Sequence, residues 1–367
     1  MTDTDLIFHR KGSLGFVTLN RPAALNALSL DIVRRFDPQL RAWAVDPTVE
    51  AVVVQGAGDK AFCAGGDLKM LYQAGRDAAG GLGSAPAIRE FFYRQYSLNR
   101  LIKRYPKPYI ALMDGIVMGG GTGVCQHGSH RIGTERTLFA MPETAVGIFP
   151  DVGATYFLPR CPGGLGMFLG LTGARLKAAD CLHAGLIDAH VPFASLDGLI
   201  DDLANLKAQG GALPTAIAAV IEWHAAFPGT PPLQAHRRAI DRCFGLERLE
   251  DIFAGLDAEG TEWAAGVLNT LRRMSPTSLA VAHEAMRRGA DLEFEDCMVM
   301  EYRLSQALIA GPDFYEGVRA ILVDRDNNPR WNPASVEAVA AAGVDRYFQP
   351  PPHDDLRFTD HNRPSEK

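Results

Sequence analysis

The 367-residue chain has 47% hydrophobic and 22% charged residues, which suits one large or two medium-sized globular domains. A net charge of -6 and the lack of a long basic tract argue against binding to nucleic acid through its phosphates. No run of 18 apolar residues predicts a membrane-spanning helix, and the acidic start of the chain argues against a secretory signal.

The first half of the chain alternates predicted strands and helices. Strands are expected at 15–20 and 49–56, with a helix between them for which Ser29 suits the N-cap. Residues 75–86 have the composition of a loop, and a helix over 87–105 stops before Pro106. Strand, turn and helix follow over 107–124. This alternation predicts an α/β fold.

The pattern changes after about residue 192. Residues 193–345 read as helices joined by Pro- and Gly-containing turns, with few strand signals. The last stretch, 346–367, is rich in proline and charge and predicts an extended tail. We therefore divide the chain into an α/β core over 1–192, a helical C-terminal region and this tail.

Two glycine-rich turns stand out in the α/β core. "AFCAGGDL" (61–68) and "MGGGTG" (118–123) each follow a buried strand and precede a helical pattern. Glycine lets backbone N–H groups approach a ligand closely, and a helix N-terminus offers free donors. Tight packing of a strand against a helix also needs glycine, and each turn alone favours that reading. The dinucleotide, P-loop and GxSxG motifs do not occur.

Taken in order, five segments resemble the crotonase superfamily of acyl-CoA enzymes. They are "LNRPAALNALS", "AFCAGGDL", "KPYIALMDGIVMGGG", "FAMPETAVGIFPDVGATYFLPR" and "LTGARLKAADCLHAGLID". Together with "MSPTSLAV" and "DFYEGVRAILVDRDNNPRWNP", the fourth segment resembles the 3-hydroxyisobutyryl-CoA hydrolase branch. The resemblance implies a ClpP/crotonase-like spiral of ββα units followed by C-terminal helices.

The same resemblance implies an oxyanion hole, in which two backbone N–H groups stabilise the thioester oxygen as it gains negative charge. Motif position gives this role to Gly66 and Gly120. The residues that the resemblance implies for substrate or CoA binding are Ala24, Leu25, Ala64, Asp67, Leu68, Gln95 and Gly119.

Two carboxylates lie in the otherwise apolar segment "AMPETAVGIFPDVG". From the segment alone, Glu143 suits the first turn of a helix and Asp151 suits a helix cap. The resemblance instead implies that they form the catalytic pair, in which Glu143 attacks the thioester or activates water and Asp151 receives the 3-hydroxyl group. Gly123 stands where hydratases of the superfamily carry a glutamate.

Two positions depart from the branch. Gln95 aligns with a glutamate on the helix before "KPYIALMDG", and an amide cannot act as a base. Ala23 replaces a basic residue that contacts CoA phosphates, for which Arg21 and Lys69 are candidate replacements.

We therefore predict an enzyme that hydrolyses a 3-hydroxyacyl-CoA thioester, with 3-hydroxyisobutyryl-CoA of valine breakdown as the preferred substrate. An enoyl-CoA hydratase or isomerase, and a non-catalytic acyl-CoA-binding subunit, remain alternatives. No metal or redox cofactor is expected, since coenzyme A is part of the substrate, and a homo-oligomer is possible. Six scattered cysteines without CxxC spacing favour reduced thiols in the cytoplasm.

Overall fold

The computed structural model describes residues 4–78, 85–206 and 212–358. Half of the predicted loop at 75–86, residues 79–84, and the last part of the predicted tail, 359–367, lie outside the described residues. Gly75 and Arg76 belong to helix α2 (Leu68–Arg76), which is thus two residues longer than predicted. Its end is fixed by packing, because a Cβ on Gly75 would lie within 2.9 Å of the Tyr315 ring.

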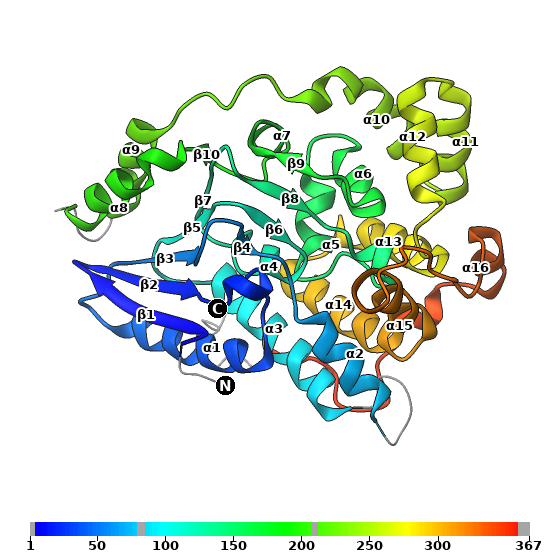
Figure 1. The fold of residues 1–367 in the computed structure, drawn as a ribbon, viewed down its shortest axis with the longest axis horizontal. Coiled ribbons are helices and arrows are strands. Elements are labelled where there is room, and N and C mark those ends of the chain that lie inside the picture. Colours follow the sequence, from blue (N-terminus) through cyan, green and yellow to red (C-terminus); the bar gives the residue numbers. More distant parts are fainter. Residues whose placement is uncertain (1–3, 79–84, 207–211, 359–367) are drawn as a thin grey trace, which may run out of the picture.

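The described strands form two sheets (Figure 1). The six-stranded sheet has the order β1-β2-β3-β5-β7-β10, and the four-stranded sheet has the order β4-β6-β8-β9. All neighbouring pairs are parallel except β1 with β2 and β8 with β9. The strands are β1 (Leu6–Lys11), β2 (Leu14–Leu19), β3 (Ala51–Gly56), β4 (Ala61–Cys63), β5 (Tyr109–Met113), β6 (Ile116–Met118), β7 (His130–Gly133), β8 (Leu138–Ala140), β9 (Leu176–Lys177) and β10 (Ala189–His190).

Successive strands alternate between the two sheets. β3, β5 and β7 join the larger sheet, and β4, β6 and β8, which follow each of them in the chain, join the smaller one. A helix follows each pair, so the chain climbs in ββα repeats as predicted. The helices of this part are α1 (Leu30–Val45), α2, α3 (Pro86–Lys103), α4 (Gly120–Gly123), α5 (Ala154–Phe157), α6 (Leu165–Thr172) and α7 (Ala178–His183).

Helix α1 illustrates how the local sequence directs the fold. The Ser29 hydroxyl accepts a hydrogen bond from the backbone N–H of Ile32, which caps the helix as predicted. Apolar side chains at helical spacing, among them Ile32, Phe36 and Leu40, are fully buried. Through this face α1 packs against α3 under the sheets (Figure 1).

The second half of the described chain is helical, as predicted. In Figure 1, α8 and α9 lie beside β10 at one end of the molecule, and α10 to α12 lie at the other end. Residues 225–231 join these two groups without regular structure. The helices are α8 (Leu196–Ala204), α9 (Leu213–His224), α10 (Arg237–Phe244), α11 (Leu249–Glu259), α12 (Glu262–Leu271), α13 (Pro276–Gly289), α14 (Phe294–Ile309), α15 (Pro312–Val318) and α16 (Val336–Ala342).

One apolar core runs through both halves of the chain. It holds side chains from the strands and α1 to α6 together with side chains from α10 to α15, and it includes Phe348 and Leu356 near the end of the described chain. Helix α14 packs directly against α3. A second, smaller cluster lies between the six-stranded sheet and helices α8 and α9, where Phe16 and Ile110 lie with Leu199 and Ile217. The helical region therefore completes the interior of the α/β part.

Candidate active site

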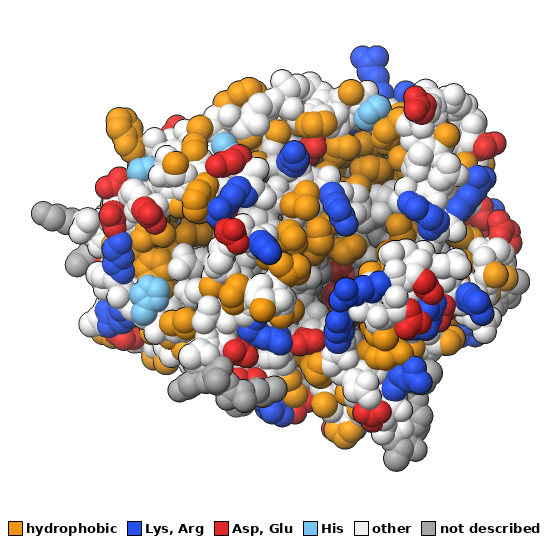
Figure 2. All heavy atoms as spheres, viewed as in Figure 1, with side chains coloured by type: hydrophobic (Ala, Val, Ile, Leu, Met, Phe, Trp, Pro, Cys, Tyr) orange, Lys and Arg blue, Asp and Glu red, His pale blue; other side chains and the backbone are white. Residues whose placement is uncertain are grey.

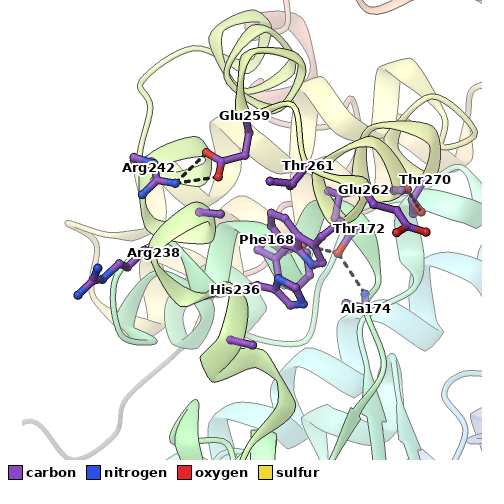
Figure 3. A pocket seen from close by; sticks show the side chains of 15 residues that line it. Phe168, Thr172, Ala174, His236, Arg238, Arg242, Glu259, Thr261, Glu262 and Thr270 are labelled. Carbon is purple, nitrogen blue, oxygen red and sulfur yellow. Dashed lines mark hydrogen bonds and ion pairs between the residues drawn. The ribbon is translucent and has the colours of Figure 1, made fainter.

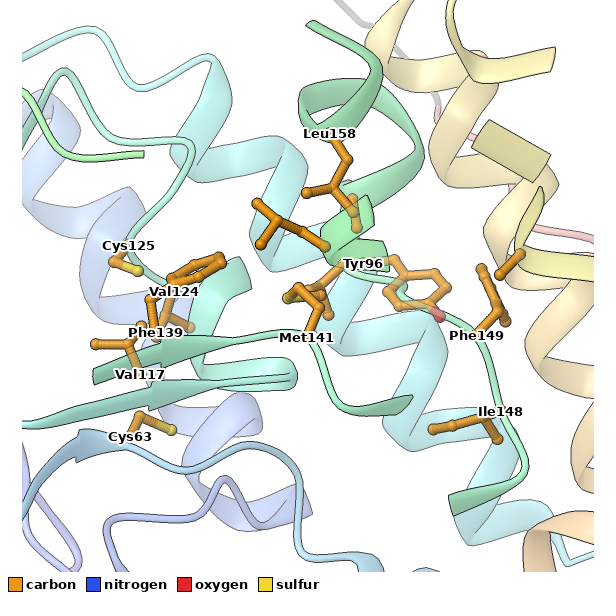
Figure 4. Packing of buried hydrophobic residues seen from close by; sticks show 14 of the residues in the cluster. Cys63, Tyr96, Val117, Val124, Cys125, Phe139, Met141, Ile148, Phe149 and Leu158 are labelled. Carbon is orange, nitrogen blue, oxygen red and sulfur yellow. The ribbon is translucent and has the colours of Figure 1, made fainter. Parts of the chain in front are cut away.

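Three consecutive strands of the smaller sheet end at the same edge. β4, β6 and β8 are parallel neighbours, and they bury Cys63, Val117 and Phe139 side by side (Figure 4). The turn with Gly66 follows β4, the turn with Gly120 follows β6, and Glu143 follows β8. Because parallel strands end together, the fold brings three segments that are far apart in the sequence into contact.

The amides of Gly66 and Gly120 lie close together. A Cβ built on Gly120 would lie 3.0 Å from the Gly66 nitrogen, and one built on Gly65 would lie 3.6 Å from the Gly120 nitrogen. Gly120 is the first residue of α4, so its N–H has no acceptor within the helix. Among the described residues, no backbone oxygen outside the regular elements accepts from either amide. Two free donors thus stand at one place, as an oxyanion hole requires.

A small cavity of ≈ 80 Å³ opens at these amides. Its walls include the apolar side chains of Leu68, Leu71, Phe91, Val146 and Ile148. Its polar groups are few and are contributed by different elements. The predicted site residues that line it are Ala64, Gly66, Leu68, Gln95, Gly119, Gly120, Glu143 and Asp151.

Glu143 begins a short 3₁₀ helix, Glu143–Val146, and is only 4% exposed. Its Oε2 has no hydrogen-bond partner in the described structure, and a Cβ on Gly119 would lie 2.8 Å from its Oε1. Burial and, secondarily, the negative charge of Asp151 raise the pKa of Glu143 well above its ordinary value. A buried carboxylate with free lone pairs beside two free amides is available for chemistry.

Asp151 is 6% exposed and accepts a hydrogen bond of 2.7 Å from the Tyr96 hydroxyl. Burial raises the pKa of Asp151 to about 6, although the Tyr96 bond opposes the rise. The N-cap of α5 is Gly153, without a side-chain cap, so Asp151 does not cap this helix with its carboxylate. Only its backbone oxygen takes part, by accepting from Ala154 N.

The turn after Asp151 has an unusual backbone. Val152 and Gly153 have φ values of 55° and 88°, and a positive φ is rare for a β-branched residue. The Val152 carbonyl bonds to the His127 ring at 2.6 Å. The carboxylate of Glu301, on α14, accepts from Gly153 N at 2.7 Å and from Thr155 N at 3.0 Å. Hydrogen bonds with His127 and Glu301 thus hold the turn at the strained Val152 and just after it.

The position of the hydratase glutamate is closed. A Cβ on Gly123 would lie 2.6 Å from the Asn99 amide nitrogen and 2.8 Å from Val152 Cβ. Asn99 in turn donates to the Gly123 carbonyl at 2.8 Å. The strained Val152 and the buried Asn99 therefore occupy the space that a side chain at 123 would need.

Gln95 lies over the second glycine turn. It is 2% exposed, and its amide nitrogen is 2.6 Å from the Cβ position of Gly120. Next to it on α3, Tyr96 is fully buried against Asp151. Gln95 therefore presents a neutral amide to the cavity at the position where the branch carries a carboxylate.

Two of the residues implied for substrate or CoA binding, Ala24 and Leu25, lie outside the small cavity. Leu25 lines an adjoining hollow of ≈ 260 Å³ with Ala23, Asp59 and Lys60, whereas Ala24 is exposed beside it. A further hollow of ≈ 480 Å³ lies between α2 and the turn after α15, and is lined by Lys69, Tyr72, Leu322 and Arg325 among others. Figure 2 shows a group of basic side chains near α15.

Asp67 and Arg21 are engaged in the local structure. Asp67 is the N-cap of α2, and its carboxylate accepts from Met70 N at 3.3 Å and from Arg21 at 3.1 Å. Arg21 also bonds the Ala27 carbonyl and lies 3.7 Å from Asp5. Neither residue lines the cavity. The two candidate phosphate ligands were Arg21 and Lys69. Because these contacts hold Arg21, only Lys69 has a side chain without a bonding partner among the described residues.

A larger hollow of ≈ 940 Å³ lies between α6, α10 and α12 (Figure 3). The Trp263 ring stacks on His236 there, and the charged Arg242 is paired with Glu259. Neither of the carboxylates that line this hollow, Glu259 and Glu262, is buried, unlike Glu143 and Asp151, so we place the site in the small cavity. Among residues 4–78, 85–206 and 212–358, no cluster of His, Cys, Asp and Glu could hold a metal ion, and no helix is long and apolar enough to cross a membrane.

Sequence reasoning missed two residues of the site. Tyr96 follows Gln95 on a helix whose buried face was visible in the sequence. Glu301 is the only acid among Cys297, Met298, Leu304 and Leu308, which are buried at helical spacing on α14. An acid on an apolar helix face is a detectable signal, but only the fold connects it with Asp151.

The family model for enoyl-CoA hydratase/isomerase matches residues 14–348. A Danio rerio protein named "3-hydroxyisobutyryl-CoA hydrolase, mitochondrial" is 43% identical over 357 residues, which cover 97% of this chain and 92% of its own. The Homo sapiens protein of the same name is 41% identical over 359 residues, with 96% and 91% covered.

Two solved structures are similar along the whole chain. A carnitinyl-CoA dehydratase from Mycobacterium thermoresistibile has a TM-score of 0.87 at 38% identity and covers 97% of this chain and 99% of its own. An enoyl-CoA hydratase from Rhodobacter sphaeroides 2.4.1 has a TM-score of 0.85 at 38% identity, with 96% and 100% covered.

Proposed function

This chain belongs to the enoyl-CoA hydratase/isomerase family, and we propose that it hydrolyses 3-hydroxyisobutyryl-CoA to 3-hydroxyisobutyrate and free coenzyme A. The observation that carries the proposal is the pair of buried carboxylates, Glu143 and Asp151, in one cavity with the amides of Gly66 and Gly120. The relatives named as hydrolases of this thioester support the choice of substrate.

The cavity suggests how the substrate lies. The thioester oxygen accepts hydrogen bonds from the amides of Gly66 and Gly120, which stabilise it as it becomes negative. Removing one such donor commonly costs about 3 kcal/mol of transition-state stabilisation. The 3-hydroxyl group donates to Asp151, whose other partner is the Tyr96 hydroxyl. The small volume and the walls of Leu71, Phe91 and Ile148 suit a short acyl group.

Glu143 performs the chemical step. It either attacks the thioester carbon, which forms an acyl intermediate that water then opens, or removes a proton from a water molecule that attacks this carbon; the C–S bond breaks, and the departing thiolate takes up the proton that the water gives up. Burial makes Glu143 a stronger base than an exposed glutamate, which suits proton removal near neutral pH. The free lone pairs of its Oε2 suit both roles.

A hydratase is the weaker candidate. The solved relatives at 38% identity are titled as a dehydratase and a hydratase, so their titles do not agree with the hydrolase names. The contacts of Asn99 and Val152 at Gly123 argue for hydrolysis, because they leave no space for the second glutamate that adds water across a double bond.

The phosphates of coenzyme A need cations. Lys60 lines the hollow beside Leu25, and Lys69 and Arg325 line the hollow between α2 and the turn after α15. Among the described residues these three side chains make no ion pair. We assign the phosphates to them, in place of the basic residue that Ala23 replaces.

The direct test is release of free thiol from 3-hydroxyisobutyryl-CoA by the purified protein. We expect turnover by the wild type and a fall of at least about 10³-fold in Glu143→Gln, because the variant keeps the shape but loses the base or nucleophile. Loss of the enoyl absorbance with crotonyl-CoA would instead identify a hydratase. Tight binding of CoA esters with no turnover across a panel would identify a binding subunit.

A second measurement tests whether Glu143 acts as a nucleophile. Turnover in ¹⁸O-labelled water places label in the Glu143 carboxylate if Glu143 forms a covalent acyl intermediate that water opens at the Glu143 carbonyl. Unlabelled Glu143 with labelled product indicates that water attacks the acyl carbon, either in the thioester or in the intermediate. Mass spectrometry of the peptide that contains Glu143 detects the label.

We also propose a cellular setting for the reaction. We place the reaction in valine breakdown, which follows from the proposed substrate. All six cysteines are free, which suits a reducing compartment such as the cytoplasm. The relatives carry the word mitochondrial in their names, so fractionation of cells with an antibody to this protein is the appropriate test.

A further inference from the structure

Helix α14 places a third carboxylate against the site. Glu301 is fully buried and lies 146 to 150 positions after Asp151 and its neighbours in the chain, yet it accepts hydrogen bonds from Gly153 N, Thr155 N and the Thr155 hydroxyl. Both of its oxygens are used, Oε2 by Gly153 and Oε1 by Thr155. Within the part of the chain that the structure describes, its side chain therefore bonds only to the turn that begins at Asp151.

That turn does not hold its shape through regular structure. Val152 and Gly153 both have positive φ, and α5 beyond them is only four residues long. The external hydrogen bonds join the His127 ring to the Val152 carbonyl, and the next two free amides donate to Glu301. Glu301 thus determines the direction in which the backbone leaves Asp151.

We propose that Glu301 is a positioning residue, which holds the 151–155 turn so that the Asp151 carboxylate faces the cavity and selects acyl groups that carry a 3-hydroxyl. The inference rests on the proposed function, in which Asp151 receives this hydroxyl. Glu301 does not line the cavity and does not touch the substrate. Its effect is expected in the preference between substrates rather than in the chemical step.

The burial of Glu301 supports this role. Burial, with a smaller contribution from the charge of Asp151, raises the pKa of Glu301 to about 8 against the effect of its bonds to Gly153 and Thr155. Burying a carboxyl group at this position costs free energy of folding, whereas an apolar side chain would pack well with the neighbouring Met298 and Leu304. The cost is explained if the three hydrogen bonds to the turn are required.

The experiment compares 3-hydroxyisobutyryl-CoA with isobutyryl-CoA, which lacks only the hydroxyl. In Glu301→Gln, a side-chain NH2 group replaces one carboxylate oxygen. This group is a donor and faces a backbone N–H, which is also a donor, so one of the hydrogen bonds is lost. We expect the ratio of kcat/KM for the two substrates to fall at least about tenfold, with isobutyryl-CoA turnover nearly unchanged. Thr155→Val removes only the hydroxyl donor and should lower the ratio less.

Asp180→Asn is the matched control. Asp180 is a buried carboxylate on α7 that accepts from Leu233 N, away from the cavity. We expect this variant to keep the wild-type substrate ratio. Equal losses for both substrates in Glu301→Gln, or a wild-type ratio in a folded Glu301→Gln, would overturn the inference. If Glu301→Gln does not fold, Thr155→Val decides by the same ratio.

A crystal structure of Glu301→Gln, or of Thr155→Val if Glu301→Gln does not fold, tests the geometry without turnover. We expect the turn to shift and the 2.7 Å bond between Tyr96 and Asp151 to lengthen or break. An unchanged turn refutes the positioning role, whatever the wild type hydrolyses. Absence of turnover by the wild type, together with a shifted turn in the variant, refutes the proposed function alone.

Discussion

Replacing Asp151 by asparagine should stabilise the protein at neutral pH while it removes activity. The folded protein binds the Asp151 proton more tightly than the unfolded chain does, because burial raises the pKa from 3.8 to about 6. Folding is therefore favoured at low pH, and a cost develops as the pH rises from about 4 through 6. At 1.36 kcal/mol per pH unit, this cost reaches about 3 kcal/mol above pH 6.

Asparagine has the same shape and carries no such cost, and its amide oxygen can still accept from Tyr96. The linkage relation gives a cost of about 1.6 kcal/mol at about pH 5 and about 3 kcal/mol at about pH 8. The advantage of Asp151→Asn in the free energy of unfolding should therefore grow by about 1.4 kcal/mol between these conditions. Removing the charge also eases ionisation of Glu143, which acts in the same direction.

Urea unfolding of both proteins at the two pH values measures this difference. Asp257→Asn, which removes an exposed carboxylate on α11, is the control and should show no such growth. A difference that stays constant with pH, or one that shrinks toward pH 8, would refute the claim that Asp151 is held in a poorly solvated site. Activity with 3-hydroxyisobutyryl-CoA should fall in the same variant, because its side chain no longer carries the negative charge that accepts the hydroxyl.

Three further substitutions, with Gly266→Ala as a control, test the rest of the site. Gly120→Ala places a methyl group 2.6 Å from the Gln95 amide, and we expect kcat to fall by about 10²–10³. Gly266→Ala on α12, where a Cβ meets nothing within 4 Å, should keep full activity and add about 0.5–1 kcal/mol of stability. Gly123→Glu should overpack the core at a cost of at least about 1–3 kcal/mol and should gain no hydration of crotonyl-CoA. Lys69→Glu should raise KM about tenfold at low salt and less at high salt, with no effect on a pantetheine thioester that lacks the nucleotide. Full activity in Gly120→Ala, hydration by Gly123→Glu, or an equal rise in KM for the pantetheine thioester would each contradict the corresponding assignment.

The sequence predicted the α/β repeats and the cavity-lining residues because their signals are local. Buried strands that end in glycine, as at "AFCAGGDL", predict both a strand and an open turn, and the order of such motifs pointed to the family. Three of the site residues, Gly66, Gly120 and Glu143, follow strands that are parallel neighbours, and this brings them together. Asp151 follows Glu143 in the same segment. Each of these residues is identified by the chain around it.

Contacts between distant segments were not predictable in this way. Nothing near Asp67 in the sequence indicates that Arg21 occupies its carboxylate, and nothing near Tyr96 indicates that its hydroxyl meets Asp151. Such partners depend on how helices pack, which one sequence does not encode in a local pattern. The closure of the space at Gly123 by Asn99 and Val152 is of the same kind.

The hydrogen bonds that Glu301 accepts from the turn at 153–155 also affect the order of folding during synthesis. A chain that emerges from the ribosome in order can pair β4, β6 and β8 early, but the residue that fastens the Asp151 turn follows some 150 positions later. A fragment that ends at residue 192 would expose apolar surface that α13 and α14 cover, and its carboxylate pair would lack support. Catalytic competence should therefore appear late in synthesis, as one of the last events in the assembly of the molecule.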